Sequence, residues 1–158
     1  MKKSKCAAII MFLLISIVLL LSFLLNNQQR YESNLFTARA IFGRASEQIQ
    51  TKLVRGAGLS GEESDFIIDC EISLAAHRLI DGGFPHLSSG TERQIGISVE
   101  NMRDELLSAE GARLVQDKIN AIRQQLSSVD TSFVVSLIQH TLWRDRCSYC
   151  AVIAAIID

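Results

Sequence analysis

An uninterrupted apolar stretch at residues 7–25, AAIIMFLLISIVLLLSFLL, constrains this chain more than any other feature. It contains no charged residue, no proline and no glycine. An α-helix of this length, rising about 1.5 Å per residue, is ~28 Å long, which is close to the ~30 Å hydrocarbon thickness of a bilayer. The stretch is longer than the apolar part of a cleavable signal peptide, and no small-x-small motif follows it. The sequence therefore predicts a retained transmembrane signal-anchor helix over residues 7–25.

The charges of the chain are divided unevenly by this apolar stretch. Residues 1–6 carry three lysines and no acid, whereas residues 26–158 carry 13 basic and 17 acidic residues, a net charge of −4. Because basic flanks stay in the cytoplasm, we expect a cytoplasmic stub at 1–6 and an extracytoplasmic domain at 26–158. The MKKSK start and the absence of an Asn-x-Ser/Thr site favour a bacterial inner membrane and a periplasmic domain over a eukaryotic type II protein.

Residues 26–158 have a suitable length for one domain with one hydrophobic core. Their apolar residues recur at spacings of three and four, and one proline occurs in the chain. This pattern predicts an all-α fold, a bundle of four or five amphipathic helices with short connections. The expected inward-facing stripes are Leu35, Ala38, Phe42, Ala45, Ile49 and Leu53; Ile67, Cys70, Leu74 and His77; Ile95, Val99, Met102 and Leu106; Ala112, Val115, Ile119, Ile122 and Leu126; and Phe133, Val134, Leu137, Ile138 and Leu142.

Several sequence signals predict where these helices begin and end. The first should continue from the anchor as a stalk and end at the glycines of residues 56–58. Capping boxes are expected at residues 60–63 and 91–94, an interruption at Ser108 or Gly111, and an N-cap at Asp130. The last helix is expected to continue through Trp143 into the apolar tail, residues 151–157. We expect this tail to pack into the bundle, with an exposed docking tail as the alternative.

The domain contains three cysteines, Cys70, Cys147 and Cys150. In an oxidising compartment, one disulfide and one free thiol are the simplest outcome. A bond between Cys147 and Cys150 would constrain little, because residues i and i+3 of a helix are already neighbours. A bond from Cys70 to either of them would close a loop of roughly 80 residues, for which chain entropy gives about 4 to 5 kcal/mol. We therefore expect Cys70 to pair with one of the two.

Two other uses of the cysteines remain as alternatives. The Cys147-Ser148-Tyr149-Cys150 motif has the spacing of a redox dithiol, although neither a preceding β-strand nor a long following helix is predicted. The three cysteines, together with His77 or His140, could also form a tetrahedral zinc site, with which disulfide formation competes. The sequence contains no nucleophile elbow, His-Glu-x-x-His motif or phosphate-binding glycine loop. We accordingly predict no catalytic residue, metal, cofactor or small-molecule substrate.

These observations favour a non-enzymatic envelope protein whose helical domain binds another protein. Nucleic acid is not an expected partner, because the domain is acidic and its arginines are dispersed among acids. The partner is expected to be a toxin or wall-degrading enzyme that the domain inhibits, as immunity proteins do, or a subunit of a secretion, conjugation or lysis apparatus. The alternative function is thiol-disulfide exchange at the CxxC pair. Binding is expected through the loop at residues 82–95 and its flanking helix ends, and the predicted binding residues are Phe84, Pro85, His86, Leu87 and Arg93.

Overall fold

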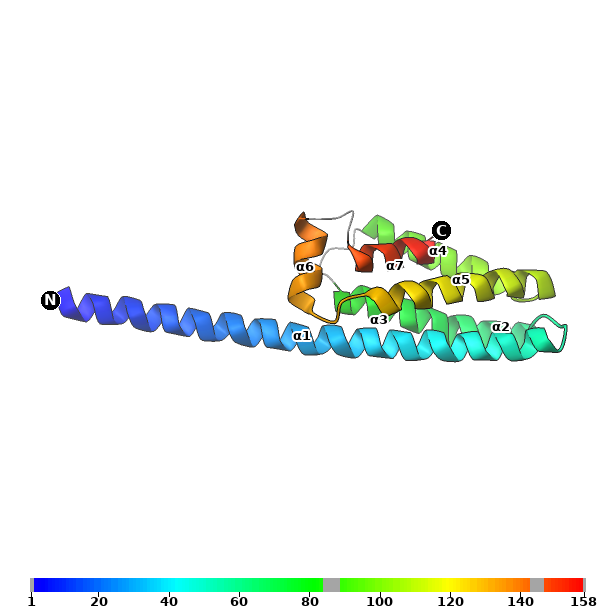
Figure 1. Ribbon diagram of the computed structural model, residues 1–158, viewed down its shortest axis with the longest axis horizontal. Coiled ribbons are helices and arrows are strands. Elements are labelled where there is room, and N and C mark those ends of the chain that lie inside the picture. Colours follow the sequence, from blue (N-terminus) through cyan, green and yellow to red (C-terminus); the bar gives the residue numbers. More distant parts are fainter. Residues whose placement is uncertain (1, 84–88, 143–146, 158) are drawn as a thin grey trace.

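The computed structural model describes residues 2–83, 89–142 and 147–157, and all regular structure in these ranges is helical (Figure 1). The predicted all-α fold, with one long apolar helix at its start, is confirmed. The bundle lies along the second half of that helix, and the first half projects away from it (Figure 1). The elements are α1 (Lys2–Val54), α2 (Gly61–Phe66), the π-helix η1 (Ile67–Ile72), α3 (Ser73–Gly83), α4 (Ser89–Glu105), α5 (Ala109–Ser128), α6 (Phe133–Leu142) and α7 (Ser148–Ile157).

The helix α1 has two different halves joined without a break. Side chains from Ile9 to Phe23 are all exposed, and none of the apolar window is buried against the rest of the protein. This half is long and apolar enough to cross a membrane, and its exposure distinguishes it from a core helix. In the second half, the predicted stripe is buried from Leu35, at 2% exposure, to Ile49, at 0%, and Leu53 at its end is partly buried.

The end of α1 follows the sequence signals closely. Gly56 adopts a φ of 71°, the left-handed conformation that glycine accepts without strain. The capping box at the start of α2 is present: Glu63 N donates to Ser60 Oγ (3.3 Å) and Ser60 N donates to Glu63 Oε2 (3.0 Å). Lys52 donates to the same carboxylate and, with the Ser60 amide, lowers the pKa of Glu63 to about 2.

The segment from α2 to α3 differs from the predicted helix in its phase. Ile67 is buried as expected, but Cys70, Leu74 and His77 are exposed, so the predicted stripe is wrong. The π-helix η1 explains the difference. In an α-helix, residues spaced four apart exceed one full turn by about 40°, so a row of them gradually leaves the buried face. The wider turn of a π-helix offsets this rotation and keeps such a row on one face. The buried residues accordingly form two adjacent rows with a spacing of four: Ser64, Ile68, Ile72 and Ala76 in one, and Ile67, Glu71, Ala75 and Leu79 in the other.

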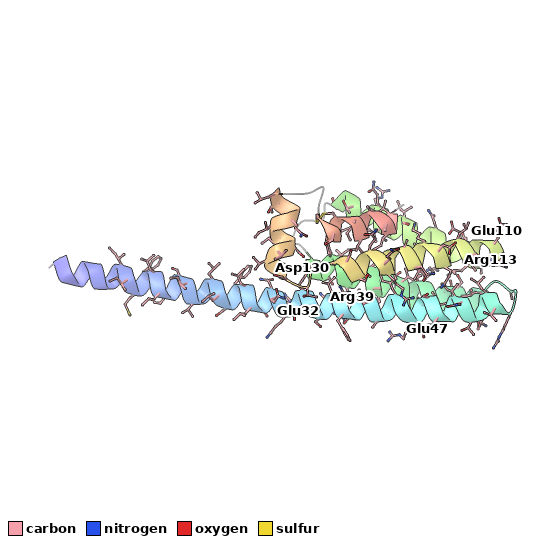
Figure 2. All side chains as sticks on the ribbon, in the orientation of Figure 1. Glu32, Arg39, Glu47, Glu110, Arg113 and Asp130 are labelled. Carbon is pink, nitrogen blue, oxygen red and sulfur yellow. A yellow bond between two sulfur atoms is a disulfide. The ribbon has the colours of Figure 1, made fainter. Side chains whose placement is uncertain are left out.

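The helices α4 and α5 match their predicted stripes, all of which are buried. Ser108 is the N-cap of α5, since its hydroxyl accepts from Gly111 N (2.9 Å). The second capping box is not at a helix start, because α4 already begins at Ser89 and Thr91 lies within it. At the other end of α5, Arg39 reaches across from α1 and donates to the carbonyl oxygens of Leu126 and Val129 (Figure 2).

The last predicted helix is divided into α6 and α7. Ser132 precedes α6 and its hydroxyl accepts from Val135 N (3.4 Å), whereas Asp130 accepts from Ser132 N (2.7 Å), so Asp130 is not the N-cap. Of the expected α6 stripe, Phe133 is buried and Val134 exposed. The tail forms α7 and packs against α4 and α5, with Val152, Ile153 and Ile156 buried, as expected for a tail within the bundle.

Candidate partner-binding groove

A groove of about 530 Å³ lies between α3 and α4, and we call it the α3/α4 groove. Ala76, Ile95 and Val99 form a buried apolar floor, each with an exposure of 3% or less. Leu74 is 41% exposed and extends this apolar surface toward solvent. Such a surface can accept an apolar side chain from a partner. The remaining lining residues are Asp69, Ser73, His77, Ile80, Asp81, Glu92 and Gly96.

The charged side chains that line the groove have one sign. Asp69, Asp81 and Glu92 are exposed carboxylates, and the described residues that line the groove include neither lysine nor arginine. Arg103 compensates part of this charge from outside the lining, since its guanidinium donates to Asp69 (2.5 Å). It also pairs with Asp65 at 3.2 Å. The groove therefore combines an apolar floor with an acidic rim, an arrangement that is complementary to a segment with apolar and basic side chains.

The π-helix η1 rotates the following residues of α3 and thereby brings Leu74 and His77 into the lining of the groove. In the straight α-helix expected from the sequence, Leu74 and His77 would face the core; in the structure both line the groove. The signal that could have shown this is the recurrence of apolar residues at intervals of four at Ile68, Ile72 and Ala76. The expected inward position of His77 is accordingly wrong, because its side chain is exposed.

The binding residues predicted from sequence are only partly described. Phe84, Pro85, His86 and Leu87 lie outside the described residues. Arg93 is exposed on the first turns of α4 but does not line the groove. The structure thus places the groove between the two helix ends that flank the predicted segment, and it adds residues of α3 that the sequence interpretation had assigned to the core.

A buried carboxylate lies behind the groove, on the side of η1 that faces α1. The Glu71 side chain is 6% exposed, accepts from Gln48 Nε2 (3.2 Å) and pairs with Arg44 Nε at 3.5 Å. Burial raises the pKa of Glu71, and the pairing with Arg44 and Gln48 offsets only part of this rise. Glu71 therefore belongs to the packing between η1 and α1 and does not line the groove.

The disulfide joins Cys147 to Cys150, and the expected pairing of Cys70 is wrong. Cys70 is exposed and free on η1, because the π-helix turns it away from the core. Cys147 immediately precedes α7, so the two cysteines span the first turn of a new helix with their Cα atoms 5.2 Å apart. Cys150 N donates to Cys147 Sγ at 3.2 Å. The long-range crosslink proposed from loop entropy is thus replaced by a local one.

The surroundings of the disulfide bear on the alternative chemistries. A dithiol at the start of a helix is the arrangement that stabilises a thiolate, but Cys147 is only 4% exposed, which limits attack by another protein. Among the described residues, no group of three or more His, Cys, Asp or Glu side chains could hold a metal. The alternative zinc ligands Cys70 and His77 are both exposed, and the side chain of His140 is outside the described set.

Comparison with known proteins does not add a family to these observations. No protein-family model, curated protein or solved structure matches the chain.

Proposed function

We propose that this chain is a single-pass protein of a bacterial inner membrane, with residues 1–6 in the cytoplasm and the helical domain in the periplasm. The exposed apolar half of α1 supports the membrane assignment. The three lysines before it, and the net charge of −4 after it, support the orientation. The Cys147–Cys150 pair is consistent with an oxidising compartment.

The proposed function of the domain is to bind another protein through the α3/α4 groove. The observation that carries this proposal is the apolar floor of Ala76, Ile95 and Val99 beneath a rim of carboxylates, with no lysine or arginine among the lining residues that the structure describes. Binding of an apolar side chain would exclude water from this floor, and the rim would favour basic residues beside it. The partner in this proposal presents an exposed segment that is both apolar and basic.

Tethering has a direct consequence for such a binder. A domain held at the membrane surface has a raised effective concentration toward a partner that reaches the same surface. This suits either form of the proposal: an inhibitor of immunity type that binds an incoming toxin or wall-degrading enzyme, or an accessory subunit of a secretion, conjugation or lysis apparatus. An inhibitor would abolish the activity of its partner on binding, whereas an accessory subunit would co-purify with an assembled complex.

Photo-crosslinking in bacterial cells tests the groove directly. A photoreactive phenylalanine analogue at Leu74 should crosslink the full-length chain to a partner, and the same analogue at Phe36 should not. Phe36 is 73% exposed on α1, so it is a matched control for accessibility. Leu74→Lys should weaken partner capture at least about tenfold by opposing burial of the apolar segment, whereas Leu114→Lys on α5 should not. Equal crosslinking from both positions would contradict the groove as the binding site.

Thiol-disulfide exchange is the second candidate function, and the position of Cys147 and Cys150 across the start of α7 is the observation in its favour. In this case Cys147→Ser abolishes turnover in a disulfide-exchange assay without unfolding the domain. Under the binding proposal, the double replacement of Cys147 and Cys150 by Ser leaves partner crosslinking from Leu74 intact. The low exposure of Cys147 is the reason to rank this function second.

A further inference from the structure

The short helix α6 has an apolar face that the rest of the described domain leaves uncovered. Val134, Val135, Ile138 and Leu142 are exposed by 42%, 38%, 39% and 71%, respectively. The helix contains no Asp, Glu, Lys or Arg. Thr141 lies among these residues, and its hydroxyl donates to the Leu137 carbonyl at 2.8 Å, so this polar group is satisfied within the helix. In the described part of the domain no other helix has more than two exposed large apolar side chains.

The start of α6 is fixed to α1 just beyond the apolar half. Gln28 accepts from Phe133 N (2.7 Å) and donates to the Thr131 carbonyl (2.8 Å). Gln28 follows Leu25, the last residue of the apolar stretch, by three positions, or about 4.5 Å along the helix axis. The polar layer on each side of a bilayer is roughly 5 to 8 Å thick. If α1 crosses the membrane, α6 therefore begins within this layer.

The second observation is the orientation of α6 relative to α1. Figure 1 shows α6 across the direction of α1, at the end of the bundle nearest the projecting half. Its inner side packs on Tyr31 of α1: the rings of Phe133 and Tyr31 are 5.9 Å apart, and Ser136 Oγ is 2.7 Å from the Tyr31 hydroxyl. The exposed residues Val134, Ile138 and Leu142 lie away from this contact.

We infer that α6 is an interfacial helix that lies in the headgroup layer of the membrane crossed by α1, with lipid covering Val134, Val135, Ile138 and Leu142. A helix parallel to the surface with one uncharged apolar face is the form in which chains bind at the headgroup and acyl boundary. Continuity with the apolar half of α1 selects lipid over a protein as the occupant. The inference rests on the membrane part of the proposed function. Its consequence is that the domain has two attachments to the membrane, which fixes its tilt.

Fluorescence quenching in proteoliposomes tests this placement with the full-length chain. Trp143 is the only tryptophan, so Trp143→Phe gives a background into which one tryptophan is introduced at a time. The reporters are Ile138→Trp in α6, Phe23→Trp in the apolar half of α1 and Leu114→Trp in α5. Leu114 is 61% exposed and adjoins Arg113, which Figure 2 shows at the opposite end of the bundle. The quencher is phosphatidylcholine brominated on the upper acyl chain.

We expect Ile138→Trp to be quenched to within about twofold of Phe23→Trp, and Leu114→Trp to be unaffected. Leu142→Trp should repeat the result on the same face, which guards against a local disturbance at Ile138. Quenching of Phe23→Trp without quenching of either α6 reporter would overturn the interfacial placement, by showing that solvent or protein covers the face, and would leave the anchor intact. Quenching of none of the reporters would overturn both the placement and the anchor.

Discussion

The two halves of α1 differ in what surrounds them, although they form one unbroken helix. From Ile9 to Phe23, every side chain is exposed and none carries a charge. In the second half, Leu35, Phe42 and Ile49 are buried against the bundle, while Phe36, Glu32 and Glu47 are exposed. The first half is apolar on all sides, and the second is apolar along one stripe. The apolar side chains of the first half are therefore not covered by the protein and require apolar surroundings, whereas those of the second half are covered by the helices of the bundle.

The largest expected effect comes from placing charge in the first half. The double variant Ile15→Arg/Leu19→Arg should lose membrane retention, because an arginine at the centre of a span costs about 2.5 to 3.5 kcal/mol on insertion scales. Fractionation after alkaline extraction measures retention, and Ile15→Val/Leu19→Val is the neutral control. Retention of the arginine variant in the extracted membrane pellet would contradict a membrane-spanning first half of α1.

Removing a buried ring from the second half should destabilise the domain strongly, whereas removing an exposed ring from its outer face should not. Phe42→Ala is expected to cost about 3 to 5 kcal/mol, since the side chain is fully buried in the core. Phe36→Ala, on the same helix but 73% exposed, should change the free energy of unfolding by less than about 0.5 kcal/mol. Urea unfolding of the full-length chain in nanodiscs gives both values. An equal loss of unfolding free energy in the two variants would mean that the face of α1 containing Phe42 is not the buried face.

Replacement by alanine is expected to have opposite effects at two glycines, Gly43 within α1 and Gly58 in the turn that follows α1. A Cβ at Gly58 would lie 2.3 Å from the Leu107 carbonyl oxygen, so Gly58→Ala should destabilise the domain by about 1 to 3 kcal/mol. A Cβ at Gly43, within α1, meets no atom within 4 Å. Gly43→Ala should therefore stabilise the helix by about 0.5 to 1 kcal/mol. Thermal unfolding of the two variants should shift the midpoint in opposite directions.

The smallest expected effect concerns Glu71, whose buried carboxylate faces the second half of α1. Because burial raises the pKa of Glu71, the folded state binds its proton more tightly than the unfolded state does. Stability from this group is therefore present at acid pH and is lost as the pH rises through the raised pKa. Glu71→Gln should be as stable as the native chain at acid pH, and more stable at neutral pH by about 1 kcal/mol or less. A native chain that gains stability over the variant as the pH rises would contradict this sign.

The parts of the fold that could be predicted are those set by local pattern. The stripes of α1, α4 and α5 follow from spacings of three and four, and the Ser60–Glu63 capping box follows from chemistry within one turn. These features need no knowledge of the rest of the chain. The same holds for the exposed apolar half of α1, which length and composition identify.

The parts that could not be predicted depend on which surface each helix meets. The π-helix shifts the phase by one residue position, and this shift moved Cys70 to the surface and Leu74 and His77 into the groove. The predicted pairing of Cys70 with Cys147 or Cys150 was wrong for the same reason. Closing a long loop stabilises the fold only when the two thiols face each other at bonding distance. The groove itself arises between α3 and α4, and no local pattern encodes it.

Accessibility of two native cysteines tests the central claim, that the two halves of α1 lie respectively in a membrane and outside it. Cys6 precedes the apolar half, and Cys70 is free and exposed on the domain. Spheroplasts of a bacterial host are treated with a membrane-impermeant maleimide before or after lysis, and Cys6→Ser and Cys70→Ser assign the bands. We expect labelling of Cys70 in intact spheroplasts and of Cys6 only after lysis. Protection of Cys70 until lysis, or labelling of Cys6 before it, would contradict this placement of the two halves of α1.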